Sequence, residues 1–152
     1  MQKDYQYDEI DGIKEKTFLE DNGRGRSNNK SNKKAKILLV DDEPDVAFAL
    51  KLGLEQNGFK VDIFTDAELA LSSFSAGMYD LALLDIKMPQ INGFELYERM
   101  KKVDSKVKVC FITAHNVYYE SLKELFPGMD CDCYVKPIRI DELVRHVKKQ
   151  ID

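Results

Sequence analysis

The pattern of hydrophobic and polar positions changes near residue 36 of the chain. From there to the end, short apolar runs alternate with longer segments in which apolar residues recur every three or four positions. Short apolar runs bounded by acidic or turn residues are typical of buried strands, and a helical recurrence is typical of amphipathic helices. The pattern therefore predicts a folded domain over residues 36–152, preceded by an extension over residues 1–35.

Five strands are expected in the folded part. Two of the runs are apolar throughout, as in parallel strands that are buried on both faces, and another alternates between apolar and polar positions. The expected strands are 37–40, 59–64, 81–84, 107–112 and 133–135.

Helices are expected between these strands and after the last one. Pro44 favours a helix start, because the first turn tolerates proline, and Asn57-Gly58 marks the end of that helix. Thr65-x-x-Glu68 has the spacing of a capping box. The expected helices are 44–57, 65–74, 92–103, a stretch within 115–126, and 140–151.

Alternation of five strands with five helices predicts a doubly wound α/β fold, in which helices cover both faces of a parallel sheet. Such sheets bind ligands beyond the carboxyl ends of their strands. The candidate residues at these ends are Asp41, Asp42 and Glu43 after the first strand, Asp85 after the third, Thr113 after the fourth and Lys136 after the fifth.

The composition agrees with a single folded domain. The chain has 152 residues, of which 43% are hydrophobic and 33% charged, and this balance excludes collagen-like, wholly disordered and membrane proteins. No apolar run approaches the ~20 residues of a spanning helix, and acidic side chains among the first residues argue against a secretory signal. We therefore expect a cytoplasmic protein without membrane contact, and the three cysteines agree with a reducing compartment.

The net charge of −4 is unevenly distributed along the chain. Residues 1–21 carry seven acidic and three basic side chains, whereas residues 22–36 carry six basic and no acidic ones. The polar stretch 22–34 predicts a flexible linker, and we expect the acidic segment before it to be disordered, with a docking helix as the alternative. Residues 37–152 carry 14 basic and 20 acidic side chains, a net charge of −6, which argues against direct DNA binding by the folded part.

Three aspartate carboxylates, a hydroxyl and an ammonium group are thus expected at one rim of the sheet. Crowded carboxylates repel one another, which raises the pKa of some of them unless a cation joins the group. Mg²⁺ prefers oxygen ligands and needs only one or two protein carboxylates. With Lys136 opposite, such an ion forms a clamp for a transferring phosphoryl group. Aspartate is a known acceptor of phosphoryl groups, and Asp85, at the end of the central strand, is best placed to be the nucleophile.

Four separated blocks of sequence resemble the receiver domain of two-component response regulators. They are Ile-Leu-Leu-Val-Asp-Asp-Glu-Pro at 37–44, Leu-Leu-Asp-Ile-Lys-Met-Pro at 83–89 with Gly93 following, Thr113-Ala114, and Lys136-Pro137. Each block alone is weak, but together and in this order they are specific. The resemblance covers residues 36–152 and implies a flavodoxin-like (βα)5 sheet with strand order 2-1-3-4-5.

The resemblance also implies a role for each residue of the rim. Asp85 would accept a phosphoryl group from a histidine kinase or a phosphotransfer protein. Mg²⁺ would be held by Asp42, Asp85 and the backbone carbonyl of Lys87, with Asp41 acting through water. Lys136 would pair with the phosphoryl oxygens, and Thr113 would move its hydroxyl onto them. This movement would switch the protein contacts of a surface formed by helix four, strand five and helix five.

The sequence departs from the family pattern at one switch position. Most members place Tyr or Phe three residues before the lysine, where this chain has Cys133, and Tyr134 follows one residue later. Either Tyr134 fills the switch role after a one-residue slip, or a smaller side chain takes its place. Lys87 and His115 occupy positions at which the family tunes the loss of the phosphoryl group, so both are candidates for tuning. We expect the three cysteines, Cys110, Cys131 and Cys133, to be structural thiols.

Three classes of function agree with these observations to different degrees. The leading class is a stand-alone receiver that switches its contacts with a separate effector protein. Such a receiver could also form a homodimer when it is phosphorylated. A phosphate sink or relay is a subclass of this first class. An aspartate-based phosphatase would carry a second Asp two residues after the nucleophile, where this chain has Lys87, so a turnover enzyme is not expected. A receiver-shaped binding module that is never phosphorylated is the third class, and it is disfavoured because the acidic pair and the lysine are present.

Overall fold

The computed structural model of the chain describes residues 5–10, 13–18, 33–114, 120–121, 123–124 and 132–152. The chain divides into two units, Met1–Lys33 and Lys34–Asp152, and each is described here by itself. This division lies two residues before the boundary that the sequence predicts.

A β-hairpin forms in the N-terminal unit. Strand β1, Tyr5–Ile10, pairs antiparallel with strand β2, Ile13–Phe18, and the Cα partners run from Tyr5↔Phe18 to Ile10↔Ile13. The two residues between the strands are Asp11-Gly12, a dipeptide that two-residue hairpin loops prefer. Over these two strands the structure differs from the disorder that we expected, since residues 5–10 and 13–18 pair along their whole length.

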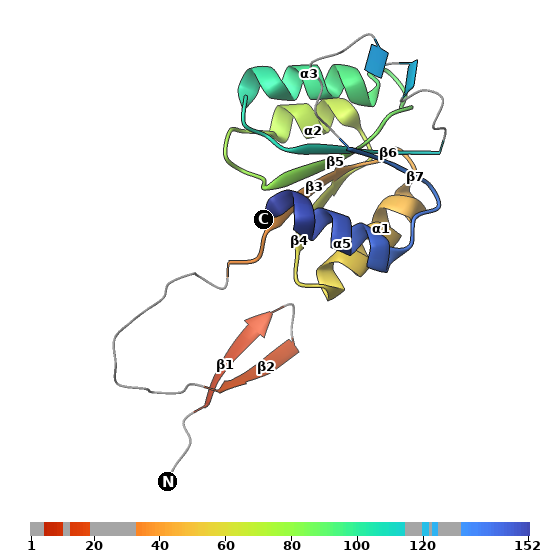
Figure 1. The fold of residues 1–152 in the computed structure, drawn as a ribbon. Helices are drawn as coiled ribbons and strands as arrows, with labels where there is room; N and C mark the ends of the chain where they lie inside the picture. Colours follow the sequence, from red (N-terminus) through yellow and green to blue (C-terminus); the bar gives the residue numbers. More distant parts are fainter. Residues whose placement is uncertain (1–4, 11–12, 19–32, 115–119, 122, 125–131) are drawn as a thin grey trace. The chain divides into compact units, whose positions relative to one another are not determined.

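A five-stranded parallel sheet forms the centre of the second unit (Figure 1). Its order is β4-β3-β5-β6-β7, which within this unit is the predicted order 2-1-3-4-5. The prediction of a doubly wound, flavodoxin-like fold is therefore confirmed. The strands are β3 (Lys36–Val40), β4 (Lys60–Phe64), β5 (Leu81–Asp85), β6 (Val109–Thr113) and β7 (Asp132–Val135).

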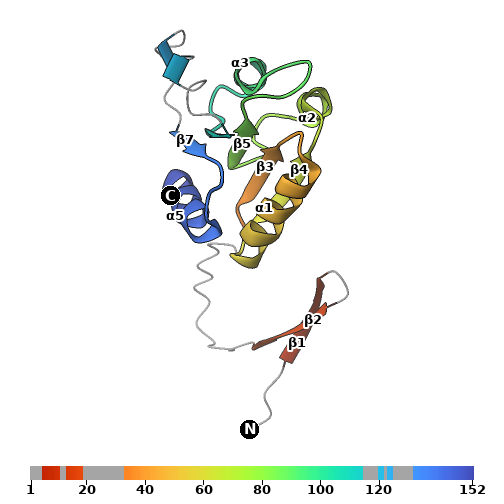
Figure 2. The ribbon, with the colours of Figure 1, turned by 90° about the vertical axis from the view of Figure 1, so that its right-hand side faces the viewer.

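Helices cover both faces of this sheet. Figure 1 shows α2 and α3 on one face and α1 and α5 on the other, and Figure 2 shows the same two layers from the side. The expected helix within 115–126 falls largely outside the described residues. The helices that lie fully within the described residues are α1 (Pro44–Gln56), α2 (Ala67–Ser73), α3 (Gly93–Val103) and α5 (Ile140–Ile151).

Side-chain caps fix the starts of two helices close to the functional rim. The Asn92 side chain accepts hydrogen bonds from the backbone N–H groups of Phe94 and Glu95, which begins α3 directly after the loop that follows β5. The capping box predicted at Thr65 is displaced by one residue, because the Asp66 side chain accepts from the two N–H groups at the start of α2.

The core lies in two layers because successive side chains of a strand point to opposite faces. Phe111 packs with Phe94 on the face covered by α2 and α3, with ring centroids 4.6 Å apart. Its neighbours in sequence, Cys110 and Ile112, pack on the other face with residues of α1 and α5. Cys110 is a buried free thiol, as expected.

No helix among the described residues is long and apolar enough to cross a membrane.

Strand β3 is held on both sides at the point where the chain enters the sheet. The backbone N–H of Lys36 donates to the Asp80 carboxylate at 2.7 Å, and the backbone N–H of Asp80 donates back to the Lys36 carbonyl at 2.8 Å. On the other side, the backbone N–H of Lys60 donates to the Ala35 carbonyl, and the Lys36 ammonium lies 3.5 Å from the Asp62 carboxylate.

Candidate functional site

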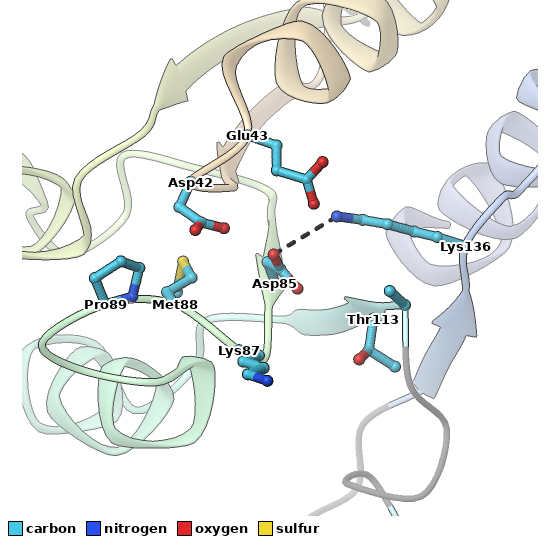
Figure 3. Close-up of a pocket in the computed structure, with 9 residues that line it drawn as sticks. Asp42, Glu43, Asp85, Lys87, Met88, Pro89, Thr113 and Lys136 are labelled. Carbon is cyan, nitrogen blue, oxygen red and sulfur yellow. Dashed lines mark ion pairs between the residues drawn. The ribbon is translucent and has the colours of Figure 1, made fainter.

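The carboxyl ends of the parallel strands bring the predicted residues together, and all of those placed here except Asp41 line one pocket (Figure 3). Asp41 and Asp42 follow β3, Asp85 ends β5, Thr113 ends β6, and Lys136 follows β7. The pocket has a volume of about 460 Å³. It is lined by Asp42, Glu43, Asp85, Lys87, Met88, Pro89, Thr113, Ala114 and Lys136.

The three aspartates form an acidic cluster at the bottom of the site. One carboxylate oxygen from each of Asp41, Asp42 and Asp85 lies within 4.8 Å of the others. Asp41 and Asp85 are only 1% and 6% exposed, whereas Asp42 is half-buried. Buried carboxylates this close together repel, and a hard divalent cation with oxygen ligands compensates for that repulsion. The donor set therefore fits Mg²⁺.

Contacts to the protein already occupy both carboxylate oxygens of Asp41. Oδ1 accepts a hydrogen bond from the backbone N–H of Glu43 at 3.0 Å, and Oδ2 lies 2.5 Å from the Lys136 ammonium nitrogen. Asp42 and Asp85 are thus the better candidates for direct metal ligands. This arrangement agrees with the indirect role of Asp41 that the family resemblance implies.

The environment of Asp85 stabilises its neutral form. Burial and the charge of Asp41 raise the pKa of Asp85 from its ordinary value of 3.8 to about 7, although the Lys136 ammonium acts in the opposite direction. A bound cation would stabilise the charged form of a carboxylate whose negative charge is so poorly compensated. Without a divalent ion, the site therefore destabilises the folded domain near neutral pH.

The Asp85→Asn variant should be more stable than the wild type at about pH 8 in the absence of divalent metal. Because the pKa of Asp85 is raised to about 7, the folded state holds a proton between about pH 4 and 7 that the unfolded chain has lost, so the free energy of unfolding falls as the pH rises through this window. Asn removes this dependence, and we expect a gain of about 1–3 kcal/mol. Urea titrations in EDTA at several pH values measure it. If the difference in the free energy of unfolding between variant and wild type did not shrink toward pH 4, this account would be contradicted.

Lys136 lies across the pocket from Asp42, with its ammonium near two carboxylates. Its nitrogen is 2.5 Å from Asp41 Oδ2 and 3.6 Å from Asp85 Oδ2, and its side chain is 13% exposed. Burial alone would lower the pKa of Lys136, but the hydrogen bond to Asp41 and the charges of Asp85 and Glu43 raise it above its ordinary value. Lys136 therefore stays protonated and holds a fixed positive charge beside Asp85.

The backbone around Asp85 is packed against the first residue of α3. The N–H of Gly93 donates to the Ile86 carbonyl at 2.8 Å. A Cβ atom at position 93 would lie 2.2 Å from the carbonyl oxygen of Asp85 and 3.0 Å from its carbonyl carbon. Only glycine allows the helix to approach the strand end so closely, so Gly93 contributes to the placement of Asp85.

Two further predicted residues, Thr113 and Lys87, line the same pocket. Thr113 is 1% exposed at the end of β6, and its carbonyl accepts a hydrogen bond from the backbone N–H of Lys136 at 2.7 Å. Lys87 lies in the exposed loop after β5. His115, the other candidate for tuning, lies outside the described residues.

Tyr134 does not line the pocket. Its Cα partner in β6 is Ile112, and it packs with the buried cluster of α1 and α5, on the opposite face of the sheet from Phe111. There its ring stacks on His146 of α5, with centroids 4.7 Å apart. A one-residue slip that brings Tyr134 to the α3 face is therefore not seen. The residue at the family's aromatic position is Cys133, whose side chain is outside the described part.

Some features of the site go beyond the roles that the sequence predicts. Glu43 was a candidate because it belongs to the acidic run after β3, but the sequence assigns it no role; it lines the pocket, and its charge helps to raise the pKa of Lys136. Met88 also lines the pocket, and the sequence gives it no separate role. The contact between Tyr134 and His146 joins residues of two different elements, and no short motif indicates it.

Comparison with known proteins agrees with this geometry. Residues 37–148 match the family model of the response regulator receiver domain. The chain is 32% identical over 113 residues to the transcriptional regulatory protein DltR of Streptococcus agalactiae, a match that covers 74% of this chain and 50% of DltR. It is 35% identical over 116 residues to the sensor protein EvgS of Escherichia coli, covering 76% of this chain and 10% of EvgS. The chain spans about half the length of DltR and a smaller part of EvgS.

Solved structures show the same fold. A CheY-like receiver domain protein of Methanospirillum hungatei superposes with a TM-score of 0.71 at 30% identity, covering 79% of this chain and 95% of that one. The response regulator TrrA of Thermotoga maritima, solved with Mg²⁺ and BeF, gives a TM-score of 0.66 at 36% identity, covering 76% and 98%. With the family model spanning most of the second unit and the acidic cluster, threonine and lysine at its strand ends, the chain belongs to the family of response regulator receiver domains.

Proposed function

We propose that this chain takes up a phosphoryl group on Asp85 in a Mg²⁺-dependent reaction and thereby changes its contacts with other proteins. The observation that carries the proposal is the position of Asp85, which belongs to the acidic cluster that fits Mg²⁺ and lies 3.6 Å from the Lys136 ammonium. With a cation bound by this cluster, the Asp85 carboxylate would lie between two positive charges, and this arrangement is suited to phosphoryl transfer, in which charge accumulates on the phosphoryl oxygens.

Each residue of the pocket has a part in this proposed reaction. A carboxylate oxygen of Asp85 attacks phosphorus while the bond from phosphorus to the donor breaks, and the donor leaves with the electron pair. Asp42 and Asp85 would hold Mg²⁺, which would supply charge neutralisation on the phosphoryl oxygens. Lys136 binds a phosphoryl oxygen from the other side. Because Asp41 holds the Lys136 ammonium through Oδ2, it orients that charge before the donor arrives.

The output is proposed to pass through protein contacts. The hydroxyl of Thr113 would move onto the new phosphoryl oxygens, and the movement would reach the surface that β7 and α5 form with the helix expected within 115–126. The donor is proposed to be a histidine kinase or a phosphotransfer protein, and no turnover of a small substrate is expected. A role as a phosphate sink is the alternative; a long-lived phosphoryl group with a partner that binds only the phosphorylated form would exclude it.

Uptake of one phosphoryl group is the direct test of this function. Incubation with acetyl phosphate and Mg²⁺ should increase the intact mass by a single phosphoryl group, and EDTA should abolish the increase. The Asp42→Asn variant, which loses one proposed metal ligand, should need a Mg²⁺ concentration at least about tenfold higher for the same uptake. The same mass increase in EDTA, or no increase at any Mg²⁺ concentration, would contradict the proposal.

A further inference from the structure

We infer that the stacked side chains of Tyr134 and His146 position Lys136, so that β7 is coupled to α5 on the face of the sheet away from α3. Their ring centroids lie 4.7 Å apart with an interplanar angle of 29°. The inference rests on the proposed function, because it assigns positioning residues to the same phosphoryl-transfer site.

Strand β7 needs such support because it lies at the edge of the sheet. Among the described strands, β6 is its single neighbour, and the other edge of the sheet belongs to β4. The last residue pair between β6 and β7 is Thr113↔Val135. One residue further along the chain, the backbone N–H of Lys136 donates a hydrogen bond to the Thr113 carbonyl at 2.7 Å. On one side, therefore, the strand end that carries Lys136 is fixed by β6. Away from β6, the side chain of Val135 is 45% exposed and therefore does little to hold the end of β7 in place.

Tyr134 supplies contacts on the α5 face. It lies two residues before Lys136, and both Tyr134 and Ile138 pack against the buried cluster of α1 and α5. His146 is half-buried on α5 and contributes the ring on which Tyr134 stacks. Figure 2 shows β7 lying next to α5. The segment from Tyr134 to Ile138 is thus attached to α5 on both sides of Lys136.

The distances from the Lys136 ammonium to its two neighbouring carboxylates differ by only about an ångström. The ammonium is 2.5 Å from Asp41 and 3.6 Å from Asp85, so a small displacement of the strand end changes which carboxylate it serves. Misplacement of a reacting group by about 1 Å is enough to slow a reaction strongly. Loss of the ring at position 146 should therefore act on phosphoryl uptake through Lys136.

The test measures the rate of phosphoryl uptake from acetyl phosphate, by intact mass, in two backgrounds. His146→Ala should slow uptake about three- to tenfold, a loss in keeping with one aromatic stack, and His146→Phe, which keeps a ring, should restore it to within about twofold. In the Lys136→Ala background, His146→Ala should cause no further loss. Arg145→Ala, an exposed neighbour on α5, is the matched control and should leave the rate unchanged.

The outcomes separate this inference from the proposed function. If the wild type takes up a phosphoryl group and His146→Ala is as fast, or slows both backgrounds equally, the positioning role is wrong while the function stands. If the wild type takes up none, the function fails, and the denaturation midpoints of the wild type, His146→Ala, Lys136→Ala and the double variant still test the coupling. Shifts for His146→Ala and Lys136→Ala that add independently would then overturn the inference, whereas a non-additive pair would support it.

Discussion

The Asp85→Asn variant should take up no phosphoryl group from acetyl phosphate under conditions that fully label the wild type. The carboxylate oxygen of Asp85 is the proposed nucleophile, and the amide of Asn cannot form the acyl phosphate. We expect the rate to fall by at least about a thousandfold, as for removal of other covalent nucleophiles. Intact mass over a time course in excess Mg²⁺ measures the loss.

Asp42→Asn is the matched control for this prediction, because it changes a neighbouring carboxylate and keeps the nucleophile. It should recover uptake at high Mg²⁺, whereas Asp85→Asn should not. Peptide mapping of the labelled wild type should place the group on the segment that contains Asp85. Equal labelling of the Asp85→Asn variant at another residue would refute the assignment of the acceptor.

Gly93→Ala should strongly destabilise the second unit. The new Cβ would lie 2.2 Å from the carbonyl oxygen of Asp85 and 3.0 Å from the Cα of Ile86, and both are backbone atoms that cannot rotate away. Alanine favours a helix over glycine by about 1 kcal/mol, but relief of this contact requires α3 or the strand end to move, at a cost of about 3 kcal/mol. The clash therefore dominates, and a net loss of about 2 kcal/mol is expected.

Urea denaturation followed by circular dichroism measures this loss, and Gly53→Ala is a suitable comparison. The three atoms nearest to a Cβ at position 53 all belong to the side chain of Ile140, the closest at 2.6 Å, and a side chain can change its rotamer. Gly53→Ala should consequently cost less than Gly93→Ala. The folded fraction of Gly93→Ala should also take up phosphoryl groups more slowly, because Asp85 moves with its carbonyl. Equal effects of the two substitutions would argue against a rigid contact at position 93.

The fold was predictable because each buried strand is a local apolar run. Residues 37–40 and 81–84 carry no polar side chain, and the parallel direction of the strands follows from the helices that connect them. The site was predictable for the same reason, since the topology alone places Asp41, Asp85 and Lys136 at one rim. The cap of α2 was misplaced by one residue because Thr65 and Asp66 are both good caps, and only the backbone conformation decides between them.

Features that depend on long-range register could not be predicted in this way. Adjacent strand residues point to opposite faces, but whether Cys133 or Tyr134 faces α5 depends on pairing with β6, which the sequence does not display. The same holds for Gly93, where the need for glycine arises from a close approach to Asp85. The hairpin over residues 5–10 and 13–18 had a local indication in Asp11-Gly12, but the polar composition around it favoured disorder.

The attachment of β3 at its start has a mechanical consequence. A pull at Lys36 directed along the strand would load two parallel ladders in shear, so the hydrogen bonds to β4 and β5 would resist together. The strand runs from Lys36 to Val40, about 17 Å at the usual rise per residue, and Asp41 follows at once. Because both ladders share the load, tension applied at the amino end of this unit would pass into β4 and β5 before it reaches Asp41, so the pairing of β3 protects the carboxylate that holds Lys136 from forces at the chain entry.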